Sequence, residues 1–256
     1  GGKKNGHDPK VLEKIWGDWE KFASYAFNKS HATCYSWVAY QTAYLKAHYP
    51  AEYMAALMTR RFSQITEITK LMEECQSMNI KTLGPDVNES YRAFGVNEHG
   101  EIRFGLSAIK GMGTPAADAI VAEREKNGPY KDIFDFAQRV DFSNVNRKAF
   151  ESLALSGGFD SFGIPRENFF GVNNKNEMFL DTLVRYGQLY QREQHEAVTS
   201  LFGGLDAIEI ATPPIPHAEG WSTIERLNKE RDLVGIYLSA HPLDDYSVVL
   251  NSMCNT

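Results

Sequence analysis

The chain has 256 residues, 43% of them hydrophobic, which is enough for one large domain or two ordinary domains with their own cores. Its formal net charge of −6 excludes a protein that is basic throughout, as a general nucleic-acid binder would be. The three cysteines are scattered and the histidines are separate, which excludes a disulfide framework and a zinc cluster. The sequence has no signal peptide and no long apolar segment, which excludes a membrane protein and predicts a cytoplasmic one.

The first third of the chain predicts helices. Asp8 and Pro9 are typical of an N-cap and a first helical turn. The apolar face of the helix that follows is formed by Val11, Leu12, Ile15, Trp16 and Trp19. Residues 27–31 interrupt this pattern, and Ser30 is a suitable cap for a second helix that ends near Ala47. Its expected inner side consists of Tyr35, Val38, Thr42 and Leu45.

Two further helices are expected before the first clear break. Pro50 opens one that runs to about Met58, and the next has apolar residues at helical spacing, namely Ile65, Ile68, Leu71, Met72 and Cys75. The sequence Leu-Gly-Pro-Asp at 83–86 then predicts a domain boundary. Beyond it, residues 91–96 and 101–106 alternate around a turn at 97–100, which is typical of a small β-hairpin.

Residues 109–120 predict a helix, a tight Gly-x-Gly turn and a second helix. The glycines, Gly111 and Gly113, allow the backbone to approach another molecule closely, and the amides that start the second helix suit a phosphate. Lys110 and Thr114 flank the turn and are further candidate contacts. The alternative is a turn between helices in which small residues merely permit close packing. The pattern favours a helix-hairpin-helix that holds a nucleic-acid backbone.

A weaker second unit of this kind is expected over residues 142–159, with Arg147 and Lys148 as candidate backbone contacts. Residues 203–220 are rich in glycine and proline and predict an extended linker. A last helix is expected over 223–233, followed by a strand-like segment at 234–238. The fold class is therefore mainly α with a small β-hairpin.

The order of several segments resembles the alpha subunit family of bacterial DNA polymerase III. The matching blocks extend over nearly the whole chain: 27–32, 39–56, 85–88, 104–111, 146–149, 156–160 and 235–243. The resemblance implies that residues 1–84 are the distal part of the polymerase fingers. Residues 85–205 would be a tandem helix-hairpin-helix domain that binds the sliding clamp, and 206–256 a linker, helix and strand that lead toward an oligonucleotide-binding barrel. The resemblance and the start at Gly1 instead of methionine together predict that the chain is a piece of a longer protein.

The resemblance also implies a nucleotidyltransferase that uses Mg²⁺, held by aspartates of a palm domain. The sequence contains no Asp-x-Asp pair, and the adjacent Asp244 and Asp245 are typical of a solvated turn. No catalytic or metal-binding residue is therefore expected in this chain, which we predict to be inactive by itself.

In the fingers, the resemblance implies that Asn28, Lys29 and His31 lie near the incoming nucleotide. A cation and an imidazole at a helix start suit a triphosphate. The alternative is that Asn28 and Ser30 only cap the helix, while Lys29 is solvated and His31 packs.

The family carries an internal peptide similar to Gln-Leu-Ser-Leu-Phe that binds the sliding clamp, the beta subunit. Residues 198–202 occupy its place, which implies that Ser200, Leu201 and Phe202 bind the clamp. Val198 replaces the glutamine, so one polar contact is in doubt. The alternative is that Leu201 and Phe202 pack under their own domain.

The expected partners are primed duplex DNA, the clamp and other polymerase III holoenzyme subunits. The net charge is +3 over residues 1–85 (11 basic, 8 acidic), −3 over 86–190 (12 and 15) and −6 over 191–256 (4 and 10), so contact with DNA should be local. Two other interpretations remain open: a damage-tolerance paralogue of the same family, and a free-standing adaptor that binds DNA and another protein.

Overall fold

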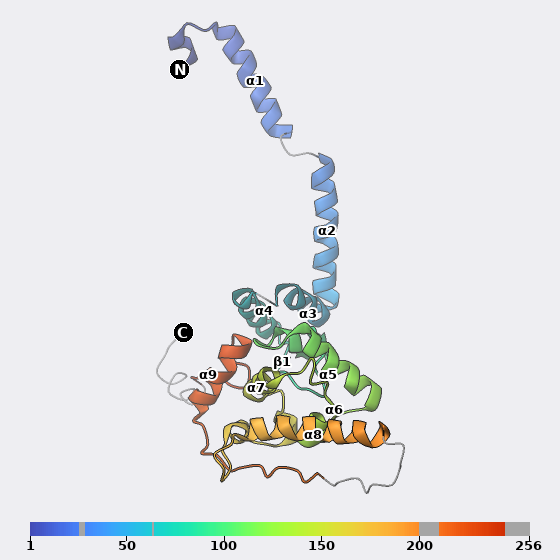
Figure 1. Cartoon of the computed structure of the whole chain (residues 1–256). Coiled ribbons are helices and arrows are strands. Elements are labelled where there is room, and N and C mark those ends of the chain that lie inside the picture. The colour runs from blue at the N-terminus through green and yellow to red at the C-terminus, as the bar shows by residue number, and fades with distance from the viewer. Residues whose placement is uncertain (26–28, 63, 200–209, 244–256) are drawn as a thin grey trace. The chain divides into compact units, whose positions relative to one another are not determined.

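A computed structural model describes residues 1–25, 29–62, 64–199 and 210–243 (Figure 1). The chain divides into two compact units, Gly1–Pro50 and Ala51–Thr256. The structure is mostly helical with one small sheet, as the sequence predicts. Within the ranges given above, no helix combines the length and the apolar character that crossing a membrane requires.

The first unit consists of a short 3-10 helix, η1 (Gly2–Asn5), and two α-helices, α1 (Pro9–Tyr25) and α2 (Lys29–His48). The predicted cap of α1 is confirmed, because Oδ1 of Asp8 accepts the amide of Lys10 at 2.9 Å. The second helix begins at Lys29, so Ser30 lies inside its first turn and is not the cap.

The apolar faces expected on these two helices are exposed instead of inward-facing. The exposed fraction is 68% for Trp16 and 65% for Trp19, and none of the residues of α2 is buried. Amphipathic spacing indicates a face that can be covered, and these side chains remain exposed.

Helix α3 (Pro50–Arg61) starts at the last residue of the first unit, and the rest of α3 and helix α4 (Ile65–Ser77) begin the second unit. The predicted packing of α4 is confirmed for Ile68, Met72 and Cys75, which are buried, and Leu71 is partly buried, but Ile65 is 41% exposed. Helix α4 leads to strand β1 (Thr82–Leu83), so the expected boundary at 83–86 falls within this compact unit.

The predicted β-hairpin is present and shorter than expected. Strands β2 (Gly95–Val96) and β3 (Ile102–Arg103) pair antiparallel, and β1 adds to β3 in parallel, giving the order β1-β3-β2. Oδ1 of Asn97 accepts the amides of His99 and Glu101, which fixes the turn. The parallel strand β1 is not foreseen by the sequence pattern.

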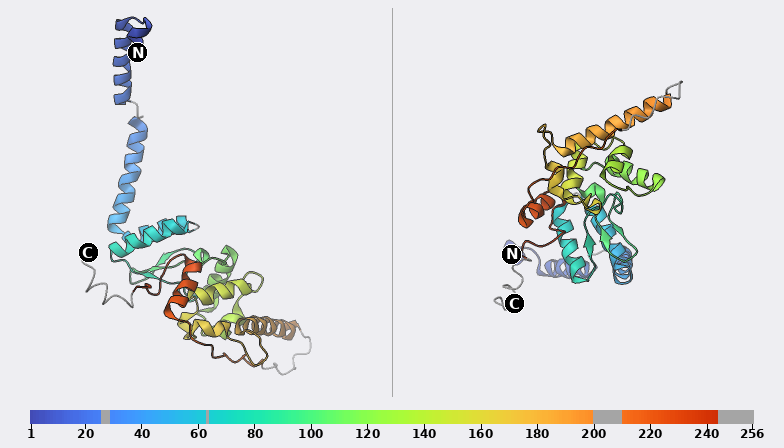
Figure 2. Two further views of the ribbon diagram at one scale, coloured as in Figure 1. Left: turned by 90° about the vertical axis from the view of Figure 1, so that its left-hand side faces the viewer. Right: turned by 90° about the horizontal axis from the view of Figure 1, so that it is seen from below.

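The helices that follow surround an aromatic core. They are η2 (Leu106–Ala108), α5 (Thr114–Asn127), α6 (Ile133–Arg139), α7 (Arg147–Ser156), η3 (Asp160–Phe162), η4 (Arg166–Phe170), α8 (Phe179–Thr199) and α9 (Thr223–Val234). Five phenylalanines are at most 1% exposed: Phe136, Phe150, Phe159, Phe169 and Phe179. Helix α8 packs on α6 and α7, and α9 packs on α7 (Figures 1 and 2). The second hairpin is the connection between α6 and α7.

Two expectations for the end of the chain meet different outcomes. The last helix is confirmed as α9, and Ser222 caps it by accepting the amide of Glu225 at 3.2 Å. The strand expected at 234–238 is not formed, because Gly235 takes a left-handed conformation with φ +85° and ends α9. In the second hairpin unit, Gly157 and Gly158 likewise follow the end of α7 and do not form its turn.

Candidate nucleic-acid interface

The Gly-x-Gly turn lies between η2 and α5. Gly111 has φ +88°, a conformation that suits glycine, and the amide of Met112 closes the turn on the carbonyl of Ile109 at 3.0 Å. The first helix of the hairpin is only the single 3-10 turn η2, shorter than expected. Ala117 and Ile120 of α5 are fully buried and form the inward face of this helix.

The turn itself faces solvent. Gly111, Gly113 and Thr114 are exposed, and the N-cap Gly113 supplies no side-chain cap. Within the described part of the chain, the amides of these three residues meet no hydrogen-bond acceptor. They lie at the N-terminus of a 14-residue helix, where the helix dipole adds a partial positive charge. This arrangement can accept an anion through backbone amides alone.

Helix α7 packs against the turn. Oγ of Ser152 donates to the carbonyl of Lys110 at 3.0 Å, and a Cβ atom on Gly111 would lie 2.7 Å from that same Oγ. The same Cβ would be 3.4 Å from Cε of Lys148, so the lysine stem passes directly beside the turn. Glycine at 111 is therefore required both by its φ and by the closeness of α7.

Two lysines place positive charge beside the amides. Lys110 is exposed and has no carboxylate within ion-pair distance among the residues described. Nζ of Lys148 lies 3.1 Å from Oε1 of Glu151, an exposed pair that costs little to separate. The structure thus brings together Lys110, Gly111, Gly113, Thr114 and Lys148.

Arg147 is directed elsewhere. Its Nε lies 2.8 Å from Asp181 of α8, and its Nη1 lies 2.5 Å from Glu151. The hydrogen bond to Asp181 is the main cause that raises the pKa of Arg147. Because two carboxylates already neutralise it, Arg147 is less available to a phosphate than Lys148.

Ser152 and Leu233 are also parts of this site, and the sequence pattern does not predict them. Ser152 is fully buried among the apolar residues of α7, and a small polar residue on an inward helix face is the signal that could have indicated it. The carbonyl of Leu233 accepts the amide of Lys110 at 2.9 Å. Because this bond joins two backbones, no side-chain pattern indicates it.

The residues expected near a nucleotide lie in the first unit. Lys29 is the first residue of α2, is exposed, and lines a cavity of about 570 Å³ with Trp37 and Tyr40. The ring of His31 stacks on Tyr35 with centroids 4.2 Å apart. Asn28 lies outside the described residues. So do Ser200, Leu201 and Phe202, the expected clamp contacts, which follow the end of α8 at Thr199.

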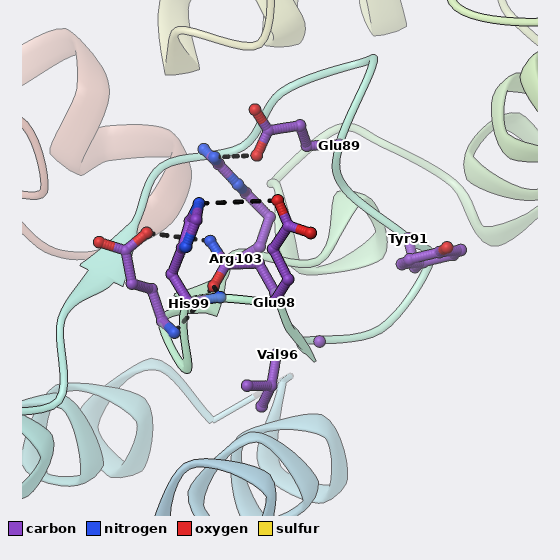
Figure 3. A pocket seen from close by; sticks show the side chains of 9 residues that line it. Glu89, Tyr91, Val96, Glu98, His99 and Arg103 are labelled. Carbon is purple, nitrogen blue, oxygen red and sulfur yellow. Dashed lines mark hydrogen bonds and ion pairs between the residues drawn. The ribbon is translucent and has the colours of Figure 1, made fainter.

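A cavity of about 530 Å³ adjoins the β2–β3 hairpin, and its lining includes none of the predicted site residues (Figure 3). Its lining includes three carboxylates, Glu89, Glu98 and Glu101, and Arg103 pairs with Glu89. Hydrogen bonds from Asn97 and then Lys81 lower the pKa of the Glu101 carboxyl, which stays ionised at neutral pH. Negative charge of this kind disfavours phosphate, so this cavity does not extend the hairpin site.

The resemblance implies a Mg²⁺ ion, but the part of the chain that is described contains no suitable set of ligands for it. No group of three or more His, Cys, Asp or Glu residues there is arranged to hold an ion. Asp244 and Asp245 lie outside the described residues. The described residues therefore do not fit a Mg²⁺ centre.

Comparison with known proteins places this geometry in a family. Residues 79–169, which contain both hairpins, match the family described as "Helix-hairpin-helix motif". The chain is 42% identical over 246 residues to DNA polymerase III subunit alpha of Chlamydia trachomatis, covering 94% of the chain and 19% of that relative. The identity is 40% over 263 residues for the same subunit of Haemophilus influenzae, covering 100% of the chain and 22% of the relative. For Escherichia coli it is 36% over 247 residues, covering 96% and 21%.

The chain spans about a fifth of the length of these relatives. The matches extend over both compact units, so they include the helices of residues 1–50 as well as the hairpin region. With a helix-hairpin-helix motif at the residues where the structure has an exposed Gly-x-Gly turn, the chain belongs to the family of DNA polymerase III alpha subunits.

Proposed function

We propose that this chain is a segment of a DNA-directed DNA polymerase III alpha subunit that grips duplex DNA by its phosphate backbone. The observation that carries the proposal is the exposed set of amides at Gly111, Gly113 and Thr114, which have no acceptor among the described residues. Backbone amides bind phosphate oxygens and carry no base specificity. Such a contact suits an enzyme that moves along any sequence.

The charge distribution supports a local grip. Lys110 and Lys148 flank the amides, while Arg147 is neutralised within the protein. Each lysine that meets a phosphate releases counterions, so the affinity for DNA falls as the salt concentration rises. A weak contact is sufficient when a second contact to the same complex raises the effective concentration.

Residues 200–202 supply that second contact in our proposal. Leu201 and Phe202 insert into an apolar pocket of the ring-shaped sliding clamp and tether the polymerase to DNA. Their support is the position after α8 and the pairing of two large apolar side chains before two glycines. Two weak contacts, one to DNA and one to the clamp, then give processive synthesis.

The first unit contributes to the fingers in our proposal, with Lys29 and His31 near the incoming triphosphate. Lys29 is exposed at the start of a 20-residue helix, where its charge adds to the helix dipole. The aspartates that hold Mg²⁺ belong to another part of the subunit. The isolated chain should therefore not incorporate nucleotides on a primed template, and incorporation by it would contradict this assignment.

The test of the DNA grip compares two glycine substitutions in the full chain. Gly111→Ala introduces a Cβ into a positive-φ residue and against Ser152, whereas Gly163→Ala introduces the same kind of strain at φ +71° in open space. Affinity for a fluorescently labelled primed duplex is measured by anisotropy. We expect Gly111→Ala to weaken binding about tenfold and Gly163→Ala to leave it unchanged. Equal affinities for both variants and the parent chain would refute the grip.

A further inference from the structure

We propose that α9 is a positioning element of the DNA-binding hairpin, although it lies beyond the region 79–169 that matches the motif family. The inference rests on the proposed grip on DNA. It assigns to Leu233, on α9, and to Ser152, on α7, the task of fixing the backbone from which the phosphate-binding amides project. Neither residue touches DNA in this proposal.

The backbone of Lys110 is held on both of its polar groups. Its amide donates to the carbonyl of Leu233 at 2.9 Å, and its carbonyl accepts the hydroxyl of Ser152 at 3.0 Å. Because both groups are taken by the protein, the peptides on either side of Lys110 have defined orientations. The next residue is Gly111, whose amide is then directed to solvent.

The carbonyl of Leu233 is available because of where α9 ends. The last carbonyls of a helix have no partner within that helix. The amide of Gly235 turns back to the carbonyl of Arg231 at 2.7 Å and satisfies that group, which leaves Leu233 to accept from Lys110. The carbonyl at the end of α9 and the amide in the hairpin are therefore hydrogen-bond partners of each other.

The end of α9 is itself fixed from several directions. Oε1 of the buried Glu230 accepts the amides of Leu238 and Ser239 at 2.8 and 2.9 Å, and its Oε2 lies 2.8 Å from Nη1 of Arg166. A Cβ on Gly235 would lie 2.4 Å from Cγ2 of Ile65 in α4, so the chain there is in close contact with another helix. Figure 2 shows α9, in red, beside α7.

The consequence for binding is preorganisation. If the hairpin already has its bound conformation, less conformational entropy is lost when DNA binds. Loosening the end of α9 should therefore lower the affinity without changing how many cations meet phosphates. The slope of log K against log salt concentration depends on that number, so it should stay constant.

The experiment uses the full chain with Gly235→Ala, Ser152→Ala and Gly163→Ala as the matched control. Gly235→Ala forces the end of α9 away from Ile65, and Ser152→Ala removes the second hydrogen bond to Lys110. Gly163→Ala adds comparable backbone strain where a Cβ meets nothing. Anisotropy with labelled primed duplex is recorded over a series of KCl concentrations. In the free protein, hydrogen exchange is followed at the amides of Lys110 and Met112, which are hydrogen-bonded to the carbonyls of Leu233 and Ile109.

We expect Gly235→Ala and Ser152→Ala each to weaken binding about threefold to tenfold, with an unchanged salt slope and faster exchange at the hairpin. Gly163→Ala should match the parent chain in all three measurements. If Gly235→Ala fails to fold, Glu230→Gln takes its place, because it weakens the ion pair with Arg166 that holds α9, whereas Ser152→Ala tests only the hydrogen bond from α7. Parent-like affinity and exchange in Ser152→Ala and Gly235→Ala, with Gly111→Ala still weakened, would overturn the role of α9 and leave the grip standing. Parent-like affinity in Gly111→Ala as well would overturn both.

Discussion

Arg166 and Glu230 form an ion pair inside the second unit, with Nη1 of the arginine 2.8 Å from Oε2 of the glutamate. Their side chains are 8% and 1% exposed. Burial alone lowers the pKa of the Arg166 guanidinium, but hydrogen bonds to Asp160 and Glu230 outweigh it and raise the pKa above its ordinary value. The guanidinium of Arg166 therefore stays charged inside the unit, and it depends on its carboxylate partners to do so.

Glu230→Ala should destabilise the second unit by about 3–5 kcal/mol, the usual cost of removing one partner of a buried ion pair. The substitution also leaves the amides of Leu238 and Ser239 without their acceptor. The free energy of unfolding in urea is the measurement. On the same helix, Glu225→Ala removes only an exposed pair with Lys229 and should cost less than about 1 kcal/mol. Equal effects of the two substitutions would contradict the buried pair.

Lys110→Ala and Lys148→Ala should each weaken binding of primed duplex and lower the salt slope by about 1, because each lysine is proposed to meet one phosphate. Arg147→Ala should change the slope less, since Asp181 and Glu151 already hold that side chain. Lys126→Ala, an exposed lysine at the other end of α5, is the control. A slope that drops equally for Lys126 and Lys110 would show only a general charge effect.

Stability should fall at alkaline pH because of Cys75. Burial, and then the nearby charge of Glu74, raises the pKa of the Cys75 thiol from 9.0 to about 11. The folded state thus keeps the neutral thiol, and this contribution is complete below about pH 9 and lost as the pH rises through about 11. Unfolding in urea at about pH 8 and about pH 10.5 measures the loss.

Cys75→Ala should make that alkaline decrease smaller, since the titrating group is gone. Part of the decrease should remain, because burial also raises the pKa of Tyr130. An identical pH dependence in Cys75→Ala and the parent chain would show that Cys75 does not contribute.

Binding to purified sliding clamp should depend on Leu201 and Phe202. Replacing both with alanine removes two apolar anchors, and we expect the affinity to fall by at least about tenfold in a titration followed by calorimetry. Ile215→Ala removes an exposed apolar side chain, 40% accessible, from the segment that follows and should have no effect. If the chain with both substitutions still binds the clamp, the contact with the clamp lies elsewhere in the chain.

Lys29→Ala in the full-length alpha subunit should raise the Michaelis constant for the incoming nucleotide by about threefold or more, with a smaller change in kcat, because a charged hydrogen bond to the triphosphate is lost. Lys14→Ala on α1 also removes an exposed lysine and is the matched control. An unchanged Michaelis constant for Lys29→Ala would leave this residue as a solvated helix start.

The sequence predicts the elements whose signals are local. Asp8 before Pro9, the apolar spacing in α4 and the two glycines at 111 and 113 each act within a few residues, and the structure has the corresponding cap, buried face and turn. The strand expected at 234–238 is not formed, and the cause is again a local signal. Valine, isoleucine and tyrosine favour a strand, but Gly235 ends the helix and Glu230 takes the amides of Leu238 and Ser239 that a strand partner would need.

Long-range backbone contacts explain the rest. Strand β1 has two residues, too few to show any alternation, and it exists because β3 accepts it as a parallel neighbour. The bond between Lys110 and Leu233 joins two main chains far apart in the sequence. On α1 and α2 the apolar spacing is correct, yet it does not say what covers Trp16 and Trp19, which are exposed in the structure.

The exposure of those indoles has a practical consequence. Three of the four tryptophans, Trp16, Trp19 and Trp37, lie on the first two helices and are more than half exposed, whereas Trp221 lies beside Phe170 with Lys229 over its ring. Water around the first three shifts their emission to longer wavelengths. A molecule that binds to the first fifty residues and covers these indoles will therefore shift the emission wavelength of the intrinsic tryptophan fluorescence. Binding there can thus be measured without an attached dye.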